Sequence, residues 1–149
     1  MVVLAPWELE LVEAQRIARL ATVDASGQPS VLPVVYAFDG ERFVTPLDGK
    51  PKRAELMRLR RVRDIQANPR VALVIDRYTE DWAQLAWVQV RGTAALVTEG
   101  GIYEHGVALL AARYPQYAAV SLAGRPLIVV TLTEVRSWRA DVLGRGATR

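Results

Sequence analysis

The stretch RLATVDASGQPSVLPVVYAFDGERFVTP, residues 19–46, decides the fold prediction. It predicts three strands in direct succession, over residues 19–24, 29–38 and 41–46. ASGQ is typical of a turn, and Asp39-Gly40 is a strong hairpin signal. Because no helix separates these strands, the stretch favours a small antiparallel barrel over the strand–helix alternation of a doubly wound sheet.

The segments on either side of this stretch extend the prediction. Helices are expected over residues 6–18, 51–66 and 101–114, and further strands over 70–76, 85–97 and 126–139. Gly92, inside the longest strand, predicts a bulge or a tight barrel bend. Residues 1–149 are therefore expected to form one mainly β (α+β) domain, a six-stranded antiparallel barrel with peripheral helices. Residues 140–149 are expected to form a loose tail.

The composition excludes several kinds of catalytic site. The chain of 149 residues has no cysteine and one histidine, His105, which is expected to be a surface or packing residue. Thiolate chemistry and disulfides are excluded, and a zinc site lacks its ligands, so no metal is expected. The sequence carries no paired-acid, Walker or Rossmann pattern. An enzyme of this composition needs an organic cofactor to supply the reactive group.

Charge and hydropathy indicate the compartment and the kind of partner. The net charge is +3, less than a dedicated nucleic-acid binder carries, and no apolar run approaches the length that crosses a bilayer. The first residues are too short for a signal peptide. A cytoplasmic protein that binds neither nucleic acid nor membrane is expected, with a small anion as the partner of its local basic patch.

Three cations stand where the second predicted helix begins. Lys50, Lys52 and Arg53 follow Asp48-Gly49 in TPLDGKPKRAELMRLR, residues 45–60. The helix dipole makes such a start partly positive, so basic side chains are unfavourable there unless an anion lies between them. A phosphate group fits this position, with the alternative that the lysines are ordinary solvated side chains.

The order of these elements resembles the flavin-binding split barrel of the pyridoxamine 5′-phosphate oxidase superfamily. The resemblance spans residues 9–138 and rests on four segments, RLATVDASGQPSVLPVVYAF, DGERFVTPLDGKPKR, NPRVALVID and WVQVRGTAAL. Within the superfamily, the short chain is most similar to the flavin/deazaflavin oxidoreductases. The resemblance implies a homodimer with coenzyme F420, or alternatively FMN, at the subunit interface. The C-terminal segment SWRADVLGRGATR ends differently from the true oxidases, so the vitamin reaction is not implied.

The resemblance also implies cofactor contacts. Pro33, Val34 and Val35 lie on the strand that runs along the cofactor ring in relatives, while Thr45 and Pro46 end the strand before the phosphate site. Gln89 and Arg91 lie on the strand that supplies polar contacts from the second subunit. Tyr36 and Arg91 are possible substrate polarisers. Each has a plain alternative: core packing for the apolar residues, and solvent-facing polar positions for the others.

These observations lead to three functional hypotheses. The first is an F420- or FMN-dependent oxidoreductase that passes a hydride between the cofactor and a small organic substrate. The second is a flavin-binding module without turnover, such as a sensor or carrier. The third is a haem-handling relative of the same barrel, which the single histidine disfavours.

Overall fold

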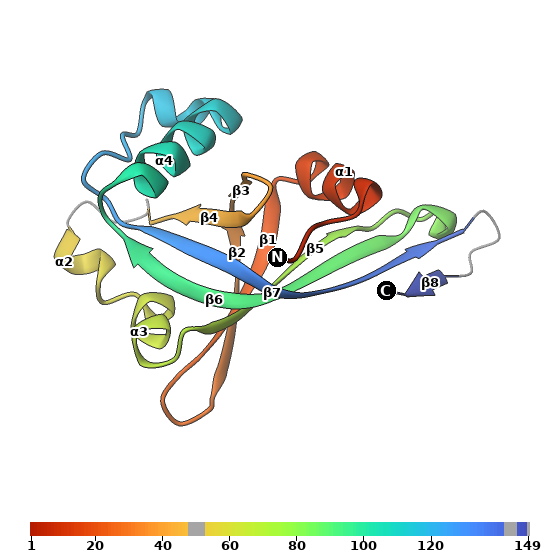
Figure 1. Cartoon of the computed structure of the whole chain (residues 1–149), viewed down its shortest axis with the longest axis horizontal. Helices are drawn as coiled ribbons and strands as arrows, with labels where there is room; N and C mark the ends of the chain where they lie inside the picture. Colours follow the sequence, from red (N-terminus) through yellow and green to blue (C-terminus); the bar gives the residue numbers. More distant parts are fainter. Residues whose placement is uncertain (48–52, 142–145, 149) are drawn as a thin grey trace.

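A curled antiparallel sheet carries the fold of the computed structural model, which describes residues 1–47, 53–141 and 146–148, with backbone only at 53 and 54. The strands follow the order β2-β1-β5-β6-β7-β4-β3, and β8 pairs with β7 (Figure 1). Their bounds are β1 Ile17–Val23, β2 Pro29–Val35, β3 Ala37–Phe38, β4 Arg42–Pro46, β5 Arg70–Arg77, β6 Ala86–Val97, β7 Leu127–Ala140 and β8 Gly146–Thr148. The two edges of the sheet approach one another, because β2 contacts β4. The predicted class, a split barrel with peripheral helices, is confirmed.

Helices and short 3₁₀ turns lie around this sheet (Figure 1). They are α1 Pro6–Ala14, α2 Arg53–Leu56, α3 Arg60–Ala67 and α4 Gly101–Arg113, with short 3₁₀ turns η1 Trp82–Gln84 and η2 Pro115–Ala118. Leu11 of α1 and Ile65 of α3 both join the main core inside the curled sheet, although the two helices lie at different ends of it (Figure 1). Leu110 of α4 belongs to a second cluster, over β3, β4 and β7.

The alternation of β6 agrees with the sequence prediction. Val88, Val90 and Ala94 are buried, whereas Gln89 and Arg91 lie on the opposite face. The pairing of β6 with β7 shifts register between Arg91 and Gly92, which confirms the predicted bulge. This irregularity bends the two longest strands and helps to curl the sheet.

The strand expected over residues 29–38 is interrupted at Tyr36. The hydroxyl of Tyr114 accepts from the Tyr36 N–H at 3.0 Å and donates to the Tyr36 carbonyl at 2.7 Å. A side chain thus satisfies backbone groups that a strand partner would otherwise bind. The chain leaves β1 at this point and joins β4, so one predicted strand becomes β2 and β3.

The helix expected over residues 51–66 is also interrupted, and α3 begins only at Arg60. Leu56 and Val62 are both buried in the main core. In a straight helix, side chains six residues apart differ in direction by about 120° around the axis, so Leu56 and Val62 would not lie on one face. Burial of both outweighs the local preference for a continuous helix.

The loose tail predicted for residues 140–149 is a further correction. β7 extends to Ala140, and Gly146–Thr148 return to pair with Trp138, Arg139 and Ala140. Together with the division of residues 29–38, this return strand accounts for eight strands where six were predicted.

Candidate functional site

A cavity lies at the split of the barrel, where β2 faces the end of β4. Its volume is about 280 Å³, and its lining is Ile17, Pro33, Val34, Val35, Thr45, Pro46 and Arg61. Five of these residues are ones that the sequence assigned to a cofactor. The structure therefore brings together Pro33, Val34 and Val35 from one strand and Thr45 and Pro46 from another, 10 or more positions along the chain.

Thr45 contributes an unusual polar group to this cavity. Its side chain is only 1% exposed, and its Oγ1 has no hydrogen-bond partner among the described residues. A buried hydroxyl without a partner costs about 1–3 kcal/mol, and most such groups are satisfied by protein or water. A small shift of the neighbouring side chains would let a ligand oxygen in the cavity reach this hydroxyl and give it the partner that the described chain does not provide.

The backbone of β2 offers further polar groups at the same place. β2 is an edge strand of the described sheet, with β1 on one side and no ladder on the other. Pro33 removes one N–H from that strand, as is common at sheet edges. The remaining carbonyl and N–H groups on the open side are suited to the polar rim of a planar ring.

Arg61 is a cavity residue that sequence reasoning missed. The sequence shows a run of Arg58, Arg60, Arg61 and Arg63 that faces several directions, and only the tertiary structure separates their roles. Arg60 forms ion pairs, with its Nη2 3.6 Å from Asp24 Oδ2 and its Nε 3.5 Å from Asp64 Oδ2. Arg61 is half-buried and lines the cavity together with Thr45. Because the start of α3 sets this direction, a prediction that placed one continuous helix here could not find it.

The predicted phosphate site is only partly covered by the structure. Lys50 and Lys52 lie outside the described residues, and Arg53 is described only as the first backbone position of α2. The site therefore stays a prediction. The described chain does place Pro46 in the cavity wall, so the cationic segment begins four residues after a cavity residue.

Gln89 lies outside the cavity, in a neighbouring hollow on the outer face of the sheet. This hollow of about 510 Å³ is lined by Arg19, Val74, Asp76, Trp87 and Gln89. Arg19 Nη1 donates to Asp76 Oδ1 at 2.7 Å. A cofactor that filled only the cavity of one chain would not touch Gln89.

Arg91 lies in a third hollow, of about 620 Å³, together with Arg70, Thr93 and Glu134. Its Nη1 is 3.1 Å from Glu134 Oε2. A hydrogen bond from Arg136 lowers the pKa of the Glu134 carboxyl, with a smaller contribution from Arg91. Arg91 is thus engaged by an ionised carboxylate within its own chain.

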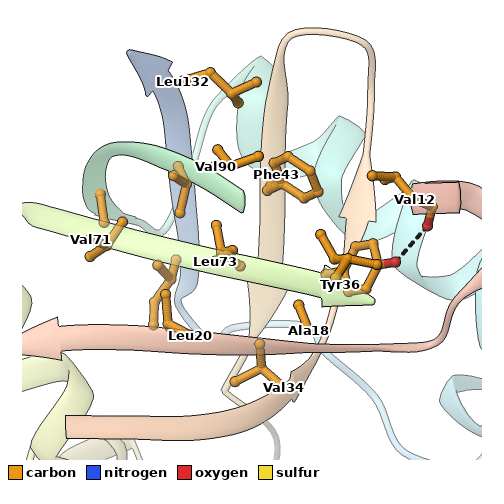
Figure 2. Packing of buried hydrophobic residues seen from close by; sticks show 14 of the residues in the cluster. Val12, Ala18, Leu20, Val34, Tyr36, Phe43, Val71, Leu73, Val90 and Leu132 are labelled. Carbon is orange, nitrogen blue, oxygen red and sulfur yellow. Dashed lines mark hydrogen bonds between the residues drawn. The ribbon is translucent and has the colours of Figure 1, made fainter. Parts of the chain in front are cut away.

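Tyr36 is not placed to polarise a substrate. Its side chain is buried among core residues such as Phe43 and Leu73 (Figure 2). The phenol donates to the Val12 carbonyl at 2.5 Å, and the Gln15 carbonyl is 3.0 Å away. Burial raises the pKa of this phenol well above its usual range. Tyr36 is therefore corrected from a substrate contact to a residue that ties α1 to the sheet.

Other expected features can be compared with the described residues. His105 is exposed on α4, as the sequence predicts. Within the described ranges, no three metal-binding side chains gather at one place. None of the described helices has the length and apolarity that a bilayer crossing requires.

Comparisons with known proteins agree with this geometry. The family model of pyridoxamine 5′-phosphate oxidase matches residues 8–139. A curated relative, the 5a,11a-dehydrotetracycline/5a,11a-dehydrooxytetracycline reductase of Streptomyces rimosus subsp. rimosus, is 35% identical over 95 residues. That match covers 63% of this chain and 64% of the relative, slightly less than two thirds of its length.

Two solved structures show the same fold. An F420 reductase is 25% identical with a TM-score of 0.62, and the match covers 89% of this chain and 98% of that one. A heme binding protein from Mycobacterium smegmatis is 20% identical with a TM-score of 0.72, covering 100% of this chain and 59% of that one. At 20% identity, the second likeness shows the fold alone.

Proposed function

The chain belongs to the pyridoxamine 5′-phosphate oxidase family, and from this premise we propose that it is an F420-dependent oxidoreductase, with FMN as the alternative cofactor. The proposed reaction is hydride transfer between the cofactor and a small organic substrate. The reductase relative supports a polycyclic acceptor with a conjugated carbonyl as the substrate class. A module that binds the cofactor without turnover remains the second candidate, and it shares the same binding site.

The observation that carries this proposal is the cavity at the split of the barrel. It combines the half-buried guanidinium of Arg61 with the buried, unpartnered hydroxyl of Thr45. Arg groups suit phosphate and carboxylate oxygens, and a hydroxyl suits either a phosphate or a carbonyl oxygen. The described residues therefore fit the anionic and polar end of a flavin or deazaflavin cofactor.

The bound cofactor would supply the hydride chemistry, and the chain would supply position and electrostatics. The open side of β2 would hold the polar rim of the ring through its backbone groups. Thr45 would donate from within the cavity, and Arg61 would neutralise negative charge there. Lys50, Lys52 and Arg53 would add donors to a phosphate. Pro33, Val35 and Ile17 would present apolar surface that excludes water from the ring.

The choice between the two cofactors rests on the F420 reductase neighbour and on the basic run that begins at Arg58. A fluorescence titration of the purified protein against F420 and against FMN tests it directly. We expect the tighter binding for F420, followed by oxidation of reduced F420 with a quinone or enone. Binding without any turnover would favour the module, and a Soret band on purification would favour the haem hypothesis.

Substitution of Thr45 tests the cavity itself. Thr45→Val keeps the shape of the side chain but removes the hydroxyl, so cofactor affinity should fall about tenfold, or about 1.4 kcal/mol. The free energy of unfolding of the cofactor-free protein should stay the same or rise, because an unsatisfied buried group is lost. Fluorescence titration and urea unfolding measure the two quantities.

The matched control is Thr22→Val, another buried threonine. Its hydroxyl donates to Asp64 Oδ2 at 2.6 Å, so it already has a partner. This variant should lose about 1–3 kcal/mol of stability and keep its cofactor affinity. If Thr45→Val behaved like Thr22→Val, the Thr45 hydroxyl would have a structural role and no ligand.

We also propose that two copies assemble through the outer face of the β2-β1-β5-β6 sheet. This face exposes apolar Val31 and Ile17 next to Ala21, and the 63% exposure of Val31 is high for a valine on a paired strand. A sheet face with such residues is commonly covered by a partner. Residues from a second copy would then complete the open cavity and bring Gln89 and Arg91 towards its ligand.

The assembly has a direct prediction. Sedimentation should give twice the chain mass of 16.5 kDa at micromolar concentration. Val31→Asp should raise the dissociation constant of the dimer at least tenfold, because assembly would then bury a carboxylate in the interface. Val120→Asp, at a position that is 44% exposed outside the sheet, is the control and should leave the dimer intact. A clean wild-type monomer would contradict the interface.

A further inference from the structure

We infer that Arg19, Asp76 and Trp87 form the acceptor subsite, which binds a planar ring that carries a carbonyl and a neighbouring hydroxyl. The subsite is the hollow of about 510 Å³ on the outer face of the sheet. Because we propose that two copies assemble through this face, the ring would be held in the dimer between the hollow and the second copy. Its role as the acceptor's place rests on the proposed function, while its ligand chemistry rests on the residues themselves. Arg19 and Asp76 were not assigned to the site from the sequence, in which Trp87 was a pocket or packing residue.

Strand register places this hollow beside the cofactor cavity. Arg19 on β1 is directly opposite Pro33 on β2, and Ile17 is opposite Val35. Residues that face each other across antiparallel strands have Cβ atoms about 4.5–5.5 Å apart, on the same face of the sheet. Ile17, Pro33 and Val35 line the cavity, and Arg19 lines the hollow. The two sites therefore meet along β1, and a ring bound over Pro33 would have Arg19 at its side.

The polar groups of the hollow form one donor–acceptor pair. Arg19 Nη1 lies 2.7 Å from Asp76 Oδ1, and the two side chains are 49% and 41% exposed. A guanidinium carries five N–H donors and a carboxylate about four acceptor positions, so one contact between them leaves both with capacity toward the hollow. The pair presents a donor and an acceptor side by side. A ligand carbonyl can accept from Arg19 while an adjacent ligand hydroxyl donates to Asp76.

The pair also argues against a simple anion as the ligand. Asp76 Oδ1 lies 2.7 Å from Arg19 Nη1 and balances its charge within the hollow. A carboxylate or enolate that bound Arg19 would therefore be repelled by the negative charge of Asp76. A neutral hydroxy-carbonyl avoids this repulsion and matches both groups. The paired charges therefore favour a neutral hydroxy-carbonyl ligand, whereas an arginine alone would also accept an anion.

Apolar side chains give the hollow its preference for a flat ring. Trp87 on β6 and Val74 on β5 are half-buried on its wall, and Gln89 adds an amide at the same face. An indole face stacks on planar conjugated rings and also favours a nearby guanidinium. A polycyclic hydroxy-carbonyl would thus combine ring stacking on Trp87 with paired hydrogen bonds to Arg19 and Asp76.

A plain surface ion pair is the competing explanation, since exposed pairs add little to stability. Two ligands that differ in one group separate the explanations. The probes are 5-hydroxy-1,4-naphthoquinone and its methyl ether, 5-methoxy-1,4-naphthoquinone, titrated calorimetrically into the cofactor-free protein. The chain has no cysteine, so thiol addition to the quinones does not interfere.

Wild-type protein should bind the hydroxy compound at least ten times more tightly than the methoxy compound. Asp76→Ala should reduce this ratio to nearly one, because the acceptor of the hydroxyl is gone. Arg19→Ala should weaken both ligands at least tenfold, because both keep the carbonyl. The control is Arg42 of β4, whose Nη1 forms an exposed ion pair with Glu41 Oε2 at 3.4 Å, away from the hollow. Arg42→Ala should change neither affinity.

Equal binding of the two ligands by wild-type protein, or no binding of either, would overturn the subsite. So would unchanged affinities in Arg19→Ala and Asp76→Ala variants that melt like wild type. Because the titration contains no cofactor, its result is separate from the cofactor proposal. A protein that discriminates the two quinones but binds neither F420 nor FMN would keep the subsite and lose the proposed oxidoreductase.

Discussion

Gly92→Ala should lower the free energy of unfolding by about 3 kcal/mol. A Cβ at this position would lie 2.3 Å from the Thr131 carbonyl oxygen and 2.9 Å from Val130 Cγ1. The first contact is with backbone of the paired strand, which cannot move aside as a flexible side chain can. Chemical denaturation, with the slope compared between variants, measures the loss.

The matched control for Gly92 is Gly101, the first residue of α4. A Cβ there meets nothing within 4 Å, and its backbone is helical. Gly101→Ala should be neutral or stabilise by up to about 1 kcal/mol. If Gly92→Ala were as stable as Gly101→Ala, the strands β6 and β7 would be less tightly held at the bulge than the structure indicates. A larger side chain, as in Gly92→Val, should then be tested for loss of folding.

The combined change Lys52→Ala and Arg53→Ala should weaken cofactor binding by about 3 kcal/mol or more, which corresponds to at least about 100-fold in dissociation constant. Two charge-assisted contacts to one phosphate would be lost together. The measurement is the fluorescence titration against F420 and FMN, at two salt concentrations, since contacts of this kind weaken as ionic strength rises.

A second double variant that removes the same charge distinguishes direct contacts with the phosphate from long-range electrostatic attraction. Arg58 and Arg63 are both exposed, and removing them changes the net charge by the same two units. Arg58→Ala with Arg63→Ala should weaken F420 less than tenfold and leave FMN almost unchanged. Equal losses in the two double variants would mean that the basic segment attracts the ligand only at long range, and the phosphate site would be withdrawn.

Several of these features follow from local sequence signals. Asp39-Gly40 indicated the hairpin between β3 and β4, and the alternation around Val88 and Val90 indicated the inner face of β6. Gly92 indicated the bulge, because glycine inside a strand marks an irregularity or a close approach of backbone. Such signals depend on turn residues and on the two-residue repeat of a strand, and both are visible in the amino-acid sequence alone.

The errors have a different origin. The division of residues 29–38 depends on Tyr114, which lies 78 positions from Tyr36 and binds its backbone. The division of the second helix depends on a core that Leu56 and Val62 must both reach. The role of Tyr36 was misjudged for the same reason, since its partner at Val12 is on another element. Each case is a long-range contact that overrides a local preference.

The antiparallel barrel and its bulge could be predicted from the amino-acid sequence, because turn residues and the two-residue repeat of strands are local signals. The assignment of strands to a cofactor came from the family resemblance and stays a prediction. Which polar groups share a cavity became clear only from the folded chain. The fold placed Arg61 beside Thr45 and Arg19 beside Pro33, and it engaged Arg91 with Glu134 and Tyr36 with α1. The sequence gives the functional group of each side chain, but its direction depends on strand register and on packing between segments that are distant in sequence.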